Sequence, residues 1–192
     1  MKNIKYLLQF FFVMFFFGIF KIIGLKNSKY LSGNLMNLLG PMFRSKKIIF
    51  SNLSKAFPNM NDQEKEKILK KMWFNYGRIF AEYMFIKDFR NDPKKLNNII
   101  IENSEILEKI KINSRPVIFI SGHFSNFELM AMEIEKSGID LAAVYRPLNN
   151  KFINPIMENI RRKYICKKQI KKGLTGTKEL LLNFKRGTSI AL

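Results

Sequence analysis

The chain has 192 residues, of which 47% are hydrophobic, so it is long enough and apolar enough to bury one core. A single cysteine, Cys166, excludes an internal disulfide framework, and a single histidine, His123, excludes a histidine-rich metal site. The chain carries 34 Lys and Arg against 15 Asp and Glu, a net charge of +19. Such a charge favours anionic partners, namely nucleic acid, phospholipid surfaces or acidic proteins.

The first segment is apolar enough to act as a membrane anchor. Residues 6–20 carry no charge, and residues 4–25 are just long enough to cross a bilayer, with Lys5 and Lys21 near the ends. A cleaved signal peptide fits less well, because no small-residue cleavage site follows Phe20. A helix lying in the plane of the interface is the remaining alternative. Two basic residues precede the uncharged run of residues 6–20, and six follow it between Lys21 and Lys47. This excess of positive charge on the C-terminal side predicts that the rest of the chain is cytoplasmic.

The remainder of the chain alternates between helical and strand patterns. We expect an anchor over residues 1–25, a membrane-proximal helical region over 26–97, and an α/β core over 98–192. In the helical region, apolar residues recur every three or four positions up to Met84, which predicts one long helix that starts near Asn61 and has a wide apolar face. Strands are expected at 98–102, 117–120, 141–145 and from 188 onward, with helices at 104–111, 125–136, 155–164 and 176–184. This order predicts an α/β fold with a largely parallel sheet flanked by helices.

The loop after the expected strand 117–120 contains the sole histidine. Ligands of open α/β sheets bind at the carboxyl ends of the strands, which is where this loop lies. His123 and Glu128 are spaced as His-x4-Glu, so an imidazole base and an orienting carboxylate can face one cleft. Ser125 and Glu128 also match a capping box, and that interpretation explains Glu128 without any chemistry.

The sequence Gly-His-Phe-Ser-Asn-Phe-Glu at 122–128 resembles the Gly-His-x-x-Asn-x-Glu block of the bacterial lipid A biosynthesis acyltransferases. Further blocks occur in the order typical of that family: the anchor-like start, residues 52–58 with 73–82, and Tyr-Arg-Pro at 145–147 with Asn-Pro at 154–155. The resemblance implies a fold like that of glycerolipid acyltransferases, an N-terminal membrane helix followed by the parallel sheet. Family members continue into an Asp-Gln block after the strand that begins here near residue 188. We therefore expect a fragment or a truncated gene product.

The resemblance implies acyl transfer from acyl carrier protein to a hydroxyl of a phosphorylated lipid A precursor, at the cytoplasmic face of the bacterial inner membrane. In that reaction His123 removes the proton of the acceptor hydroxyl, and Glu128 holds His123 in its working tautomer. Arg146 is expected to pair with a phosphate or carboxylate of the substrate, while Asn126 donates to the reacting oxygen or supports the loop. The implied reaction needs no acyl-enzyme, metal or cofactor, so Cys166 is expected to serve only in packing.

Two other functions are compatible with parts of the sequence. A membrane-tethered basic protein without catalysis would bind nucleic acid or lipid through clusters at 44–47, 161–163 and 167–172. Nucleic acid is not the expected partner, because the aromatic residues fall on apolar helical faces and do not interleave with these clusters. The second alternative is an acyltransferase for a glycerophosphate or another glycolipid. The glutamate at Glu128 disfavours it, because enzymes acting on glycerolipids more commonly have aspartate there.

Overall fold

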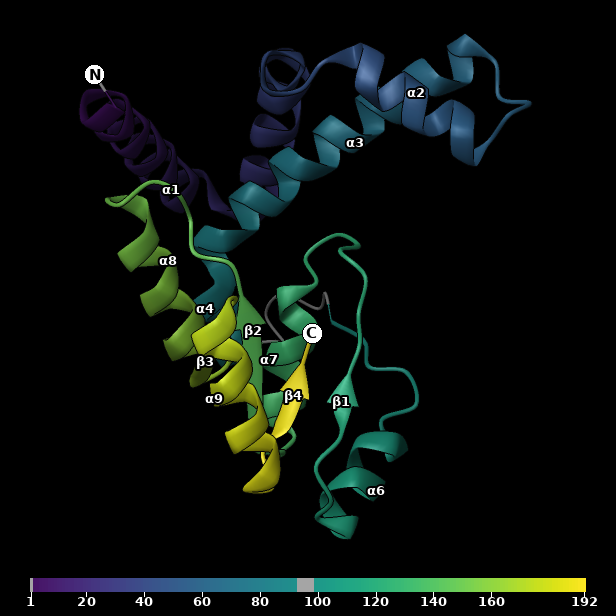
Figure 1. Ribbon diagram of the computed structural model, residues 1–192. Helices are drawn as coiled ribbons and strands as arrows, with labels where there is room; N and C mark the ends of the chain where they lie inside the picture. Colours follow the sequence, from purple (N-terminus) through teal and green to yellow (C-terminus); the bar gives the residue numbers. More distant parts are fainter. Residues whose placement is uncertain (1, 93–98) are drawn as a thin grey trace. The chain divides into compact units, whose positions relative to one another are not determined.

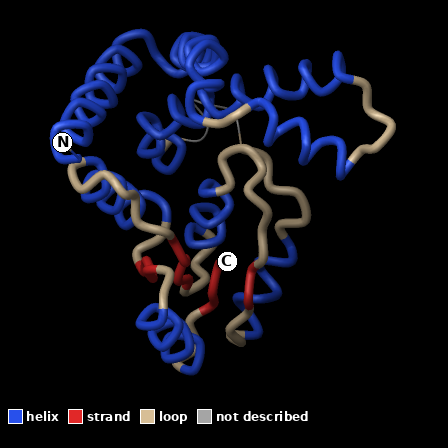
Figure 2. Tube along the Cα trace, turned by 45° about the horizontal axis from the view of Figure 1, so that its top comes forward, coloured by secondary structure: helices blue, strands red, loops and turns tan. Residues whose placement is uncertain are grey.

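The computed structural model describes residues 2–92 and 99–192 (Figure 1). The chain forms two compact units. One consists of residues 15–85, and the other combines residues 1–14 with residues 86–192. The first unit is helical, whereas the second contains the sheet (Figure 2).

Helix α1 (Lys2–Phe43) contains a sharp break at Gly24. Gly24 has φ 76° and ψ 167°, a region of backbone conformation that is accessible to glycine and costly for other residues. The buried Ser28 hydroxyl donates to the carbonyl oxygens of Phe20 and Gly24, at 3.0 and 2.7 Å, and so satisfies acceptors at the break. Within the described residues, α1 is the one helix long and apolar enough to cross a membrane, judged by length and composition.

The unit of residues 15–85 packs the second part of α1 against α2 (Lys46–Ala56) and α3 (Asp62–Glu82), which continues into the short 3₁₀ turn η1 (Tyr83–Phe85). The capping box predicted at the start of the long helix is confirmed. Asn61 Oδ1 accepts from the Glu64 N–H at 2.9 Å, and the Glu64 carboxylate accepts from the Asn61 N–H at 3.1 Å. Trp73 is buried with Ile49 and Leu69, as the apolar face of this helix predicts.

The other unit contains a four-stranded parallel sheet in the order β1-β4-β2-β3. Its strands are β1 (Ile118–Phe119), β2 (Leu141–Tyr145), β3 (Lys168–Lys171) and β4 (Ser189–Ala191). In the central part, Ala142 lies opposite Ile190 of β4 and Lys168 of β3. Ala142, Ile170 and Ile190 form the core of the sheet, and the predicted α/β fold with a parallel sheet is confirmed.

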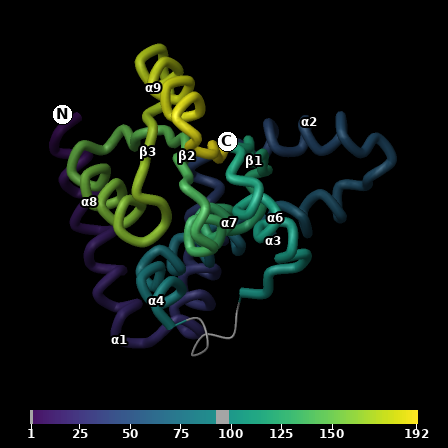
Figure 3. Tube along the Cα trace, turned by 90° about the horizontal axis from the view of Figure 1, so that it is seen from below, coloured from purple at the N-terminus to yellow at the C-terminus, as the bar shows by residue number. Residues whose placement is uncertain are grey.

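Helices cover both faces of this sheet. The helical elements of this unit are α4 (Ile86–Asn91), α6 (Glu105–Asn113), α7 (Glu128–Lys136), α8 (Ile153–Ile160), the π-helical turn η2 (Arg161–Ile165) and α9 (Leu174–Lys185). Leu180 and Phe184 of α9 pack on the core of the sheet. Helix α7 lies on the opposite face (Figure 3).

The sequence-based prediction was wrong at two strands. Residues 99–101, expected to belong to a strand, have no regular secondary structure, and a turn follows at 102–104, while Asn98 lies outside the described residues. Strand β3 was not predicted, because Lys-Gln-Ile-Lys presents a single apolar side chain, Ile170, and lacks a hydrophobic run. Only one of its residues is buried, as in a strand at the edge of the sheet.

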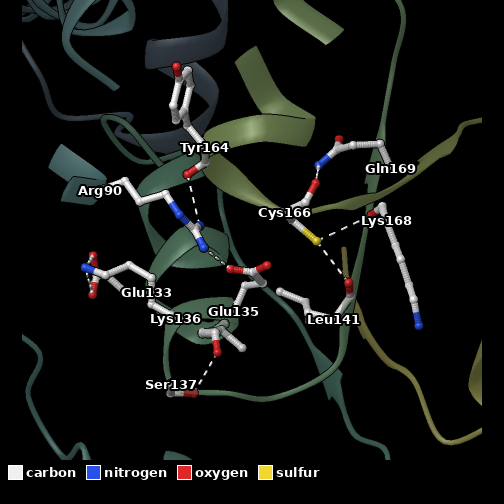
Figure 4. A network of polar contacts seen from close by, with 11 residues as sticks. Arg90, Glu133, Glu135, Lys136, Ser137, Leu141, Tyr164, Cys166, Lys168 and Gln169 are labelled. Atoms are coloured by element: carbon white, nitrogen blue, oxygen red, sulfur yellow. Dashed lines mark hydrogen bonds and ion pairs between the residues drawn. The ribbon is translucent and has the colours of Figure 1, made fainter. Parts of the chain in front are cut away.

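Arg90 ties α4 to α7 and to η2 (Figure 4). Its guanidinium donates to the carbonyl oxygen of Tyr164 at 3.2 Å and to the Glu135 carboxylate at 2.5 Å. Directly after η2, the buried Cys166 thiol donates to the carbonyl oxygen of Leu141 at 3.0 Å. Burial raises the pKa of Cys166 to about 11, so the thiol stays protonated at neutral pH and serves in packing.

Gly77 provides a test of how α1 and α3 pack. A Cβ atom at this position would overlap the backbone carbonyl of Ser32 in α1. We expect Gly77→Ala to lower the free energy of unfolding by about 1–3 kcal/mol, because two backbones must move apart. The measurement is denaturant unfolding of the chain in detergent.

Gly18→Ala is the matched control, because nothing lies within 4 Å of a Cβ added at Gly18. In a helix this change should stabilise the chain by up to about 1 kcal/mol. Equal effects of the two substitutions would contradict the close approach at Gly77.

Candidate active site

A cavity of about 240 Å³ lies at the carboxyl ends of the central strands. Val144 and Tyr145 at the end of β2, Ala191 at the end of β4, and the loop after β1 all contribute to its wall. The polar residues that line it are Ser121, His123, Glu128, Arg146, Arg161 and Gln169. This is the edge at which open α/β sheets bind their ligands, so the cavity is the candidate active site.

His123 is presented by a tight loop between β1 and α7. The Ser121 N–H donates to the carbonyl oxygen of Leu192 at 3.2 Å, which connects the start of the loop to the residue after β4. The imidazole is exposed at the cavity and packs beside the Phe127 ring, with 4.3 Å between ring centroids. An exposed imidazole at the mouth of a cavity can reach a substrate hydroxyl.

Glu128 is buried in the wall of the same cavity, where Arg161 binds its carboxylate. Arg161 Nε lies 3.2 and 3.1 Å from the two carboxylate oxygens, and Nη2 lies 2.7 Å from Oε1. Helix α7 begins at Glu128 with Phe127 as its N-cap, so the capping box of Ser125 and Glu128 is not formed and that interpretation was wrong. The carboxylate is held by a charge-assisted, two-pronged contact that fixes its orientation.

Arg161 is the site residue that the sequence did not single out. It is the first residue of the π-helical turn η2, in which the Cys166 N–H donates to the Arg161 carbonyl oxygen at 2.9 Å. Turns of this kind occur frequently at functional sites. The sequence groups Arg161 with Arg162 and Lys163 as one basic cluster, and no periodicity distinguishes the half-buried Arg161 from its two exposed neighbours.

A second set of contacts, made by Tyr145 and its partners, holds the Arg161 side chain in place. Its guanidinium lies over the Tyr145 ring, 5.8 Å from the centroid, and the Tyr145 hydroxyl donates to Glu158 at 2.7 Å. Asn154 also donates to Glu158, at 2.9 Å, and accepts from the N–H of Leu148 at 2.7 Å. Burial and the hydrogen bond to Glu158 raise the pKa of Tyr145 to about 12. The Tyr-Arg-Pro and Asn-Pro segments therefore meet at Glu158, and the ring beneath Arg161 stays neutral.

The other two predicted residues have different positions. Arg146 follows β2 and is exposed at the cavity, where a guanidinium can meet an anionic group of a ligand. Asn126 is half-buried in the loop before α7, and its backbone carbonyl accepts from the Leu129 N–H at 3.1 Å. The structure thus brings His123, Glu128 and Arg146 to one cavity, whereas Asn126 is not among the residues that line it.

Comparison with known proteins identifies the family. The family model of the bacterial lipid A biosynthesis acyltransferases matches residues 1–192, so the chain belongs to this family. The chain is similar to lipid A biosynthesis acyltransferase 2 of Shigella flexneri, at 29% identity over 115 residues, which are 59% of the chain and 36% of that protein. It is also similar to the lipid A biosynthesis myristoyltransferase of Escherichia coli (strain K12), at 26% identity over 133 residues, which are 69% of the chain and 40% of that protein. The matched part is thus less than half the length of these relatives.

We expect Arg161→Ala to lower the free energy of unfolding by about 3 kcal/mol, because it leaves the buried Glu128 carboxylate without its cation. The measurement is denaturant unfolding at neutral pH. Lys163→Ala, an exposed neighbour in the same turn, is the control and should change the free energy by less than about 0.5 kcal/mol.

Replacing Glu128 and Arg161 together by leucine should recover part of the loss, because no buried charge then remains. A fully stable Arg161→Ala variant would show that the ion pair does not hold this part of the structure.

Proposed function

We propose that the protein is an acyltransferase that moves a fatty acyl chain from acyl carrier protein to a hydroxyl of a lipid A precursor. The observation that carries the proposal is the cavity at the carboxyl ends of β2 and β4, which is lined by both His123 and Glu128. Family membership supports acyl transfer in lipid A biosynthesis, the function that the names of its relatives state. The proposed location is the bacterial inner membrane, with the cavity on the cytoplasmic side.

In the proposed reaction, His123 acts as general base. The imidazole takes the proton of the acceptor hydroxyl while the oxygen attacks the thioester carbonyl and forms a tetrahedral intermediate. When the carbon–sulfur bond breaks, the imidazolium returns the proton to the departing thiol. Acceptor and donor thus exchange one acyl group for one proton, and no covalent acyl-enzyme is formed.

Glu128 is proposed to orient His123 and to stabilise the imidazolium form. Its carboxylate is fixed at the first turn of α7 by the two-pronged contact with Arg161, so it does not need to reorganise during the reaction. Arg161, held in turn over Tyr145, acts as a positioning residue. Arg146 is proposed to bind an anionic group of a substrate at the cavity, and Asn126 to support the loop that carries His123.

The net positive charge of the chain supports the proposal that the acyl donor is an acidic protein and the acceptor a phosphorylated lipid. Several members of the basic clusters are already paired: Lys46 with Glu66, Lys168 with Asp140, and Arg161 with Glu128. The remaining excess of positive charge is available to attract an acidic carrier protein and an anionic membrane surface.

His123→Ala in the full-length chain should lower acyl transfer about 10²–10⁴-fold, the usual contribution of a positioned general base. The assay follows transfer from acylated carrier protein to a lipid A precursor. Lys178→Ala, at an exposed position of α9, is the control and should retain activity. Undiminished transfer by a folded His123→Ala variant would refute the base assigned here.

Association with acyl carrier protein should weaken as the salt concentration rises through about 0.1 M, where the Debye length is about 10 Å. Surface plasmon resonance with immobilised carrier protein at low and high salt measures this effect. Affinity that does not change with salt would contradict electrostatic recruitment of the donor.

A further inference from the structure

Residues 2–14 of the apolar helix α1 belong to the same compact unit as the sheet. The contact is made by the loop between β2 and α8. The side-chain amide of Asn150 donates to the carbonyl oxygen of Tyr6 at 2.9 Å and to the side-chain oxygen of Gln9 at 3.1 Å. Phe152 packs beside Phe10, with 6.2 Å between ring centroids. Asn150 is only 7% exposed, and its two hydrogen bonds to α1 are partly buried.

The part of α1 from residue 15 to the break at Gly24 is also covered on one side. Within the unit of residues 15–85, Phe17 and Phe20 are buried, and both rings pack against Phe80 of α3. Only six residues separate Phe10 from Phe17, which is about 9 Å of helix at 1.5 Å per residue. A bilayer core is about 30 Å thick, so no part of the helix long enough to cross it is free of protein.

The opposite side of α1 is exposed and apolar. Ile4, Leu8, Phe11 and Phe15 are 59–66% exposed. At 100° per residue these four residues fall within roughly 60° of one another, on the side of the helix opposite Tyr6, Phe10 and Phe17. Lys5 and Lys21 lie roughly 100° to either side of this apolar stripe, where lysine side chains can reach lipid headgroups.

We infer that α1 does not cross the bilayer but lies in one leaflet of an anionic membrane, with the stripe of Ile4, Leu8, Phe11 and Phe15 facing the lipid. A crossing helix would carry the Asn150 loop, and the neighbouring Lys151, into the hydrocarbon. Buried charge at that depth costs several kcal/mol, whereas a helix in the plane of the interface leaves both the loop and its lysine in water or headgroups. The N-terminal end of α1 then lies on the same side of the membrane as the sheet.

This inference concerns how the chain meets the membrane and is independent of the catalytic roles proposed above. Cysteine labelling in spheroplasts tests it in the full-length chain. Asn3→Cys places a thiol at the first turn of α1, and Lys178→Cys places one on the exposed face of α9. The unsubstituted chain, in which Cys166 is buried, provides the background. The probe is a membrane-impermeant maleimide, added before and after detergent disruption.

We expect the two introduced thiols to behave alike: protected in intact spheroplasts and labelled after disruption. Labelling of both thiols before disruption also supports the inference, but contradicts the cytoplasmic location. Labelling of Asn3→Cys alone in intact spheroplasts would show that the helix crosses the bilayer and would overturn the inference.

A substitution at Asn150 tests the contact that holds the helix. Asn150→Asp keeps the Oδ1 acceptor used by the N–H groups of Phe152 and Ile153, but it cannot donate to Tyr6 or Gln9. In phosphatidylglycerol–phosphatidylethanolamine vesicles, hydrogen exchange of residues 2–14 should become about tenfold faster. Asn149→Asp, the same change at the exposed neighbouring residue, should leave exchange unaltered. Unaltered exchange in Asn150→Asp would show that this contact does not hold the helix, and would overturn the inference.

Discussion

The contact between Glu128 and Arg161 is the constraint on which the candidate site depends. A carboxylate buried at the first turn of α7 is stable only with a cation, and the cation comes from a residue 33 positions further along the chain. To deliver it, the chain must pass through β2 and α8 and then widen into the π-helical turn η2. Tyr145, Asn154 and Glu158 make contacts that favour this path, because they fix the ring beneath the arginine.

The parallel sheet brings these parts together. In the order β1-β4-β2-β3 all carboxyl ends lie at one edge, so the loop after β1, the end of β2 and the end of β4 surround one cavity. His123 and Arg146 each follow a strand that pairs with β4, and because β1 and β2 both run parallel to β4, the two residues lie at the same edge of the sheet. The position of the histidine thus follows from topology, whereas the position of the carboxylate follows from its pairing with Arg161.

Much of the fold could be predicted from the sequence, because it rests on local patterns. The hydrophobic runs predict β2 and β4. Apolar residues spaced three and four positions apart predict α3, and the pair Asn61 and Glu64 predicts its capping box. Features that depend on distant contacts were missed or misread. Strand β3 is a mostly polar segment that pairs with β2, and the role of Arg161 is visible only once Glu128 is known to be buried. The spacing of Ser125 and Glu128 fitted a capping box, but the ion pair draws the glutamate into the cavity wall and the helix starts three residues later.

The loop between β2 and α8 connects the cavity to the proposed membrane-facing helix. Arg146 lines the cavity, and four residues later Asn150 binds α1. Four residues span at most about 14 Å even when fully extended, so the Cα atoms of Arg146 and Asn150 lie within that distance of each other. If α1 lies in one leaflet, its contact with Asn150 holds His123 and Arg146 close to the headgroup layer. A phosphorylated glycolipid could then present its hydroxyl to the imidazole while its acyl chains stay in the bilayer, and the cost of extracting a lipid into water, about 0.8 kcal/mol for each exposed CH₂ group, would be avoided.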